Sequence, residues 1–255
     1  MHLAVQQRGA GAPLILLHGL FGRGRNLLAL QTALADTYRV IAPDLRNHGA
    51  TPHAPGMDYA TLAADLWETL DGLGLDRVGL VGHSMGGKVA MRAALDTPGR
   101  VTHLAVLDIA PLAYPTTLGR FAAAMQALPL SPGLTRRAAD AALSPVVPDA
   151  ATRAFLLQNL KTGESPGWTL GLDFIAAAMP DLMRWDARPA SFTSPTLFLG
   201  GDRSDYLNAD AQAAIRAQFP TAEIEFLHDA GHWLHVDQPQ ALLKCLRVFL
   251  AGGAE

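Results

Sequence analysis

The chain has 255 residues, of which 49% are hydrophobic and 17% charged, a composition that supplies the core of a large globular domain and excludes an intrinsically disordered chain. The formal net charge is −3, so no nucleic acid is expected as a partner. Cys245 is the only cysteine, and neither a leader pattern nor an apolar run of membrane-spanning length is found, so we predict a cytoplasmic protein without disulfides or a membrane partner.

Short apolar runs alternate with longer helical patterns, which predicts an α/β fold with a mostly parallel sheet of seven or eight strands flanked by helices. Seven such runs are predicted strands: residues 3–6, 13–17, 38–42, 78–81, 103–107, 196–199 and 223–227. Helical periodicity predicts helices over residues 59–73, 85–95 and 209–218.

The loop after the third predicted strand, residues 44–49, reads Asp-Leu-Arg-Asn-His-Gly. We expect Asp44 and Arg46 to brace this loop through charged hydrogen bonds, which makes its role structural. The alternative is that Asn47 or His48 contacts a substrate.

Residues 82–86 read Gly-His-Ser-Met-Gly and directly follow the run 77–81. A serine on a sharp turn between a strand and a helix presents its hydroxyl above the edge of the sheet, and small flanking residues such as Gly82 and Gly86 allow the two elements to approach closely. This pattern is typical of the nucleophile elbow of α/β-hydrolases. It predicts Ser84 as the nucleophile of an acyl-transfer reaction.

Such a nucleophile requires two main-chain N–H groups that face the developing oxyanion. The N–H of Met85 follows the nucleophile and lies at a helix N-terminus, where the helix dipole favours negative charge. The second N–H is expected from residues 18–22, His-Gly-Leu-Phe-Gly, with Leu20 as the first choice and Phe21 as the alternative. His18 is expected to stiffen this loop by hydrogen bonding.

The alternation of strands and helices stops between residues 112 and 190. We expect this segment to be a helical cap inserted into a hydrolase core formed by residues 1–111 and 191–255. No strand is predicted in it, and its four predicted helices are residues 120–127, 136–143, 152–160 and 170–179.

The general base is expected after the last predicted strand, because the chain order of this fold is Ser, acid, His. His232 lies there, in the sequence Asp-Ala-Gly-His-Trp of residues 229–233, and Trp233 is expected to form a wall for its ring. His235 is the nearest rival, although we expect it to start the next helix or to pair with Asp237.

The acid that orients the base has more than one candidate. Asp108 closes the strand expected beside the elbow strand, and its carboxylate would reach Nδ1 of His232. The loop 200–206, Gly-Gly-Asp-Arg-Ser-Asp-Tyr, offers Asp205 or Asp202 instead. An arrangement without a charged third member is the remaining alternative.

Several of these motifs together resemble the YbfF-like esterases of the α/β-hydrolase superfamily. The motifs that carry the resemblance are residues 18–22, 44–49, 82–88, 108–111 and 230–233. The resemblance implies hydrolysis of carboxylic esters, with acyl-CoA thioesters as a further substrate class. It also implies roles for Asp108 and for Ser204, the latter as an auxiliary hydrogen-bonding partner.

Because the first-strand region leaves little room for a leading hairpin, seven strands are favoured over eight. Lys88 is expected to be solvated or ion-paired.

We therefore predict a serine hydrolase that acts on a small-molecule ester or thioester without a metal or an organic cofactor, since the chain lacks the phosphate-binding glycine loop and the zinc-binding helix motif. Within the same fold, a carbon–carbon bond hydrolase or a cofactor-free haloperoxidase is the alternative. Outside enzymes, the alternative is a non-catalytic module that binds small molecules.

Overall fold

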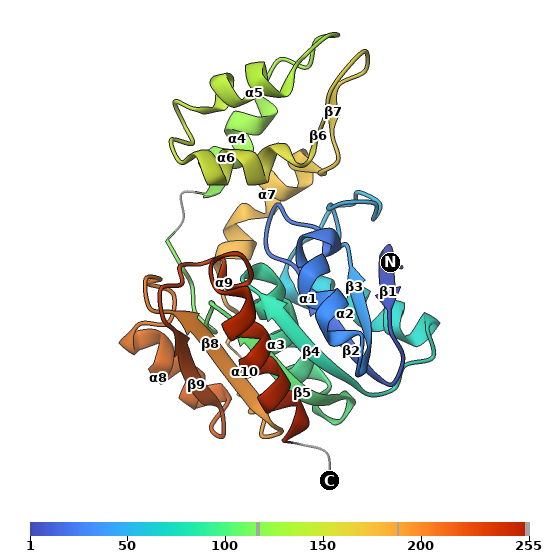
Figure 1. Cartoon of the computed structure of the whole chain (residues 1–255), viewed down its shortest axis with the longest axis vertical. Coiled ribbons are helices and arrows are strands. Elements are labelled where there is room, and N and C mark those ends of the chain that lie inside the picture. Colours follow the sequence, from blue (N-terminus) through green and yellow to red (C-terminus); the bar gives the residue numbers. More distant parts are fainter. Residues whose placement is uncertain (116–117, 188, 253–255) are drawn as a thin grey trace.

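The computed structural model describes residues 1–115, 118–187 and 189–252. Its centre is a seven-stranded sheet in the order β1-β3-β2-β4-β5-β8-β9, in which β1 is antiparallel to β3 and the other neighbours are parallel (Figure 1). The strands are β1 Val5–Arg8, β2 Ala12–Leu17, β3 Tyr38–Pro43, β4 Val78–His83, β5 Val101–Leu107, β8 Thr196–Gly201 and β9 Glu223–Leu227. The predicted α/β fold is confirmed, with seven strands rather than eight.

The first strand lies two residues later than the apolar pattern predicts. The prediction was residues 3–6, whereas β1 pairs with β3 from Val5 to Arg8. Leu3 is buried outside the sheet, and its N–H donates to Thr69 Oγ1 instead of to a neighbouring strand. The apolar signal therefore came from a side chain packed beside the strand.

Helices cover both faces of the sheet. Buried side chains of α2 (Tyr59–Gly72), α3 (Met85–Asp96) and α8 (Ala209–Gln218) share one apolar cluster with the strands. Those of α1 (Leu28–Leu34) and α10 (Pro239–Ala251) form the second cluster on the opposite face. The shorter helices are η1 Gly24–Leu27, η2 Pro98–Arg100 and α9 Leu234–Asp237. None of the helices in the described ranges is long and apolar enough to cross a membrane.

Between β5 and β8 the chain forms a separate helical layer beyond the carboxyl edge of the sheet (Figure 1). We refer to residues 112–190 as the inserted segment. Its elements are α4 Leu118–Gln126, α5 Arg136–Leu143, α6 Ala150–Leu157, β6 Leu160–Lys161, β7 Gly167–Trp168 and α7 Leu172–Met183.

Two expectations for the inserted segment were wrong. First, it contains a short antiparallel pair, β6 with β7, so the helix predicted over 152–160 ends at Leu157. Second, the helix predicted over 170–179 continues through Pro180 to Met183. Leu182 beyond the proline is buried and its carbonyl accepts a hydrogen bond from Tyr59 Oη at 2.6 Å, and these contacts hold the last turn against the core.

Candidate active site

Ser84 occupies a strained turn between β4 and α3. Its backbone has φ 52° and ψ −119°, a region that non-glycine residues rarely adopt and that is typical of functional sites. The flanking glycines explain why the turn is possible. A Cβ at Gly82 would lie 2.3 Å from the carbonyl oxygen of Gly86, and one at Gly86 would lie 2.4 Å from that of Leu17. Only glycine fits where the strand, the helix and the neighbouring loop meet.

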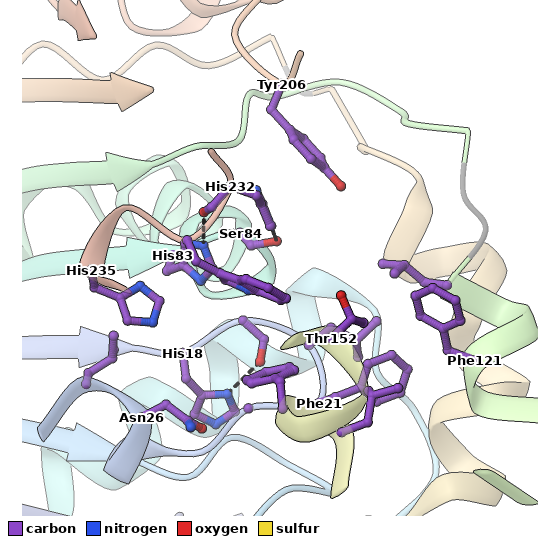
Figure 2. A pocket seen from close by; sticks show the side chains of 18 residues that line it. His18, Phe21, Asn26, His83, Ser84, Phe121, Thr152, Tyr206, His232 and His235 are labelled. Atoms are coloured by element: carbon purple, nitrogen blue, oxygen red, sulfur yellow. Dashed lines mark hydrogen bonds between the residues drawn. The ribbon is translucent and has the colours of Figure 1, made fainter. Parts of the chain in front are cut away.

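A chain of hydrogen bonds connects Ser84 to a buried carboxylate. Nε2 of His232 lies 3.1 Å from Oγ of Ser84, and Nδ1 of His232 lies 2.7 Å from Oδ2 of Asp108 (Figure 2 shows the Ser84–His232 contact). Asp108 is fully buried and follows β5 in a left-handed conformation with φ 52°. The structure therefore brings together Ser84, His232 and Asp108, the last being one of the candidate acids.

The other hydrogen bonds of Asp108 distinguish it from the alternative acids, Asp205 and Asp202. Ser204 Oγ donates to Oδ2 of Asp108 at 2.5 Å, and the N–H of Gly201 donates to Oδ1 at 3.2 Å. Asp205 is exposed, and the carboxylate of Asp202 accepts from His228 on the surface. In the described ranges neither Asp205 nor Asp202 forms a hydrogen bond or ion pair with His232, whereas Ser204 contacts the carboxylate that does.

Tyr206, two residues after Ser204, forms the wall of the imidazole. Its ring stacks on that of His232 with centroids 4.4 Å apart and an interplanar angle of 23°. The sequence-based expectation gave this place to Trp233, which contacts Phe155 of the inserted segment instead. No sequence motif indicates that Tyr206 stacks on His232, because its position depends on how the loop after β8 folds.

His83 links the nucleophile turn to the loop of the base. Its Nε2 lies 2.8 Å from the main-chain carbonyl oxygen of His232, and the two rings are 4.8 Å apart. Burial keeps the pKa of His83 well below its ordinary value, so the neutral ring donates Nε2–H to that carbonyl. The rival base His235 lies in α9 against His83, and the expected partner Asp237 accepts from the N–H of Gly231 instead.

The loop after β2 lies against the elbow, since a Cβ at Gly19 would be 3.3 Å from Cβ of Ser84. Within this loop the N–H of Phe21 donates to Nε2 of His48 at 3.1 Å, and the carbonyl of Phe21 accepts from Nδ2 of Asn159 at 2.7 Å. Both main-chain groups of Phe21, its N–H and its carbonyl, are therefore hydrogen-bonded. In the part of the chain that the structure describes, the N–H groups of Leu20 and Met85 have no acceptor.

The loop 44–49 has a structural role. The carboxylate of Asp44 accepts the N–H groups of Gly24 at 2.7 Å and Ala50 at 2.8 Å, and Arg46 pairs with Asp65 of α2. The amide of Asn47 exchanges two hydrogen bonds with the backbone of Ala54. Neither Asn47 nor His48 is among the residues that line the two cavities at Ser84.

Two buried histidines of these loops predict a pH dependence of stability. Burial lowers the pKa of His18 to about 4 and that of His48 to about 3. Both stay neutral in the folded protein while the unfolded chain binds protons below pH 6.5, so the free energy of unfolding falls as the pH drops from 6.5 towards 4. We expect His48→Gln to lower the slope of the free energy of unfolding against pH by about 1.4 kcal/mol per pH unit in this range. Urea unfolding curves measured at a series of pH values check this prediction, with the exposed His2→Gln as the control. An unchanged slope in His48→Gln would contradict the prediction.

Two cavities meet at Ser84. The larger has about 650 Å³ and is lined mainly by apolar and aromatic side chains, with Phe121 of α4 and Thr152 of α6 facing the site from the inserted segment (Figure 2). The smaller has about 420 Å³ and extends to Lys88. Leu20, Ser84, Leu118 and Tyr206 line both. An ester bound at Ser84 can therefore place one part in each cavity.

Lys88 contradicts the expectation of a solvated or ion-paired side chain. It is 2% exposed, and no carboxylate among the described residues lies within ion-pair distance of Nζ. The end of α7 covers this turn of α3, and Nζ donates to the carbonyl oxygen of Arg184 at 3.0 Å.

No group of three or more His, Cys, Asp or Glu side chains in the described ranges could hold a metal ion.

Comparison with known proteins places these features in context. A family model described as the alpha/beta hydrolase fold matches residues 12–239. The sn-1-specific diacylglycerol lipase ABHD11 of Mus musculus is 40% identical over 247 residues, covering 93% of this chain and 80% of the relative. Esterase YbfF of Escherichia coli (strain K12) is 34% identical over 246 residues, covering 96% and 95%. A solved structure, a marine microorganism esterase, superposes with a TM-score of 0.92 at 34% identity and covers 97% of this chain and 99% of its own.

Proposed function

Because the chain belongs to the α/β-hydrolase fold family, we propose that this ester-hydrolysing enzyme works through a covalent acyl-enzyme on Ser84. The observation that carries the proposal is the hydrogen-bonded series from Ser84 through His232 to Asp108, with contacts of 3.1 and 2.7 Å. A serine hydroxyl is a weak nucleophile unless a base takes its proton and a third group orients the base.

The buried carboxylate selects the tautomer of the base. Oδ2 of Asp108 accepts the Nδ1–H of His232, which leaves the lone pair of Nε2 facing the hydroxyl of Ser84. His232 takes the proton as Ser84 attacks the acyl carbonyl, and Asp108 stabilises the imidazolium that forms. The hydroxyl of Ser204 and the N–H of Gly201 keep the carboxylate in this orientation.

The charge on the carbonyl oxygen is assigned to two main-chain donors. Among the described residues the N–H groups of Leu20 and Met85 have no acceptor, both residues line the smaller cavity with Ser84, and Met85 is at the N-terminus of α3. Phe21 is not used, since His48 accepts its N–H. His232 then protonates the leaving group, and a water molecule activated by His232 hydrolyses the acyl-enzyme.

The substrate is proposed to be an ester with an apolar part. The larger cavity provides apolar surface from the core and from the inserted segment, which fits the role of residues 112–190 as a cap over a core of residues 1–111 and 191–255. Acyl thioesters use the same chemistry and are included in the proposal. The relatives named as an esterase and a diacylglycerol lipase support an ester as the substrate class.

The experiment is covalent labelling combined with a substrate panel. A fluorophosphonate probe is expected to modify the wild-type protein at Ser84, identified by mass spectrometry of the labelled peptide, and to leave Ser84→Ala unlabelled. Turnover is compared on p-nitrophenyl esters of increasing acyl length, the matching coenzyme A thioesters, a dienoic diketo acid and a bromination assay. Turnover of the diketo acid or bromination without ester hydrolysis would assign the site to another chemistry. A protein that is neither labelled nor active would be a binding module.

A further inference from the structure

The smaller cavity beside Ser84 ends at the buried amine of Lys88. Lys88 lies four residues, about one helical turn, after Ser84, which is the N-cap of α3, and this spacing is about 6 Å along the helix axis. Its Nζ donates to the carbonyl oxygen of Arg184 and lies 5.4 Å from the ring centroid of Tyr59 and 5.2 Å from that of Tyr114. An ammonium group has three N–H donors, and in the described ranges the other two have no hydrogen-bond acceptor.

The surrounding side chains do not neutralise this charge. The hydroxyl of Tyr59 donates to the carbonyl of Leu182, and that of Tyr114 donates to the carbonyl of Tyr206. Further along α3, it is Arg92 that pairs with the nearby carboxylates of Asp96 and Asp186. Burial without an acid partner lowers the pKa of Lys88 to about 7.

A buried, unpaired amine is costly to a folded protein, and a methionine or leucine would fill the same space without that cost. The bond to the Arg184 carbonyl uses one donor and offsets part of it. The remaining donors, beside the cavity that also contains the Ser84 hydroxyl, are placed for an anionic group that arrives with a ligand.

We propose that the smaller cavity binds a carboxylate of the substrate through the ammonium group of Lys88, so that the preferred esters carry a free carboxylate a short chain away from the scissile bond. This inference rests on the proposed function, because Ser84 must attack the ester while Lys88 holds the carboxylate. The larger apolar cavity takes the other part of the same molecule.

The test compares each acidic ester with a neutral ester of the same shape, by pH-stat titration. In one series the carboxylate is on the acyl part: monoethyl succinate, glutarate and adipate against ethyl butyrate, pentanoate and hexanoate. In the other it is on the alcohol: 4-(butanoyloxy)butanoate against butyl butyrate. Wild-type protein is expected to favour the acidic member in one series.

The measured quantity is kcat/KM for the acidic ester divided by kcat/KM for the neutral ester. Lys88→Met is expected to lower this ratio by about tenfold or more, mainly by raising KM for the acidic ester, because a charge-assisted hydrogen bond is lost. Damage to packing lowers the turnover of both esters and cancels in the ratio. Lys161→Met is the matched control, since Lys161 is exposed on β6, and its ratio is expected to equal that of the wild type.

An equal ratio in Lys88→Met and wild type would overturn the inference. If Lys88→Met does not fold, the wild-type series decides alone, and preference for the neutral ester in both series overturns it. Absence of hydrolysis of every ester, neutral ones included, would instead contradict the proposed function.

Discussion

Ser84→Ala is expected to lower kcat for a p-nitrophenyl ester by at least about 10³-fold, since no acyl-enzyme forms and only the donors and the binding site remain to assist water. The variant keeps the Cβ atom of residue 84 and requires the same turn at φ 52°, so its circular dichroism and melting curve are expected to match the wild type. Substrate binding survives, and KM changes far less than kcat.

Ser204→Ala is the matched control for this experiment. It removes a serine hydroxyl from the same hydrogen-bonded series, but His232 keeps both Ser84 and Asp108 as partners. We expect a loss in kcat of about tenfold or less, because one donor to the carboxylate is lost while a main-chain N–H remains. Comparable losses in Ser84→Ala and Ser204→Ala would argue against Ser84 as the nucleophile.

Asp108→Asn is the second substitution with a large expected effect. The amide of asparagine can donate to Nδ1 of His232, which would favour the tautomer with its proton on Nε2 and leave no lone pair for Ser84. A loss in kcat of about 10⁴-fold is expected, the size known for the equivalent change in a serine protease. The side chain is isosteric, so fluorophosphonate labelling should slow in parallel while folding is retained.

Asp205→Asn provides the comparison. Asp205 is an exposed residue of the loop after β8 and makes no hydrogen bond to His232 in the described structure. Its kcat is expected to stay within about twofold of the wild type, as is usual for surface substitutions. Near-normal turnover in Asp108→Asn with a collapse in Asp205→Asn would reverse the assignment of the acid.

The fold and the position of the serine could be predicted because both rest on local pattern. Apolar runs of strand length and helical spacing predict a mostly parallel sheet flanked by helices, and the glycines around Ser84 reflect contacts of 2.3–2.4 Å that no side chain could tolerate. His232 could be predicted because chain order places its loop at the same sheet edge. The resemblance to YbfF-like esterases agrees with the 34% identity to that relative.

The remaining features depend on tertiary contacts that have no local signature. The choice between Asp108 and Asp205 depends on which way two neighbouring loops turn, and the left-handed φ of Asp108 is not readable from its neighbours. Lys88 was expected in solvent because a lysine on a helix usually is exposed. Its burial results from the last turn of α7, which packs across α3 from a part of the chain almost 100 residues away.

The bond from His83 to the main-chain carbonyl of His232 has a consequence for how the enzyme can change. His83, which precedes the nucleophile, is hydrogen-bonded to the main chain of the base His232, and no residue of the inserted segment contributes to this bond. The spacing of the reacting atoms is thus set by contacts between residues of the core. Over evolutionary time the same separation allows the segment to be exchanged for another, provided that contacts such as those of Asn159 to Phe21 and of Tyr114 to Tyr206 are kept. A chimaera of this kind would inherit a new range of esters and retain the original reaction centre.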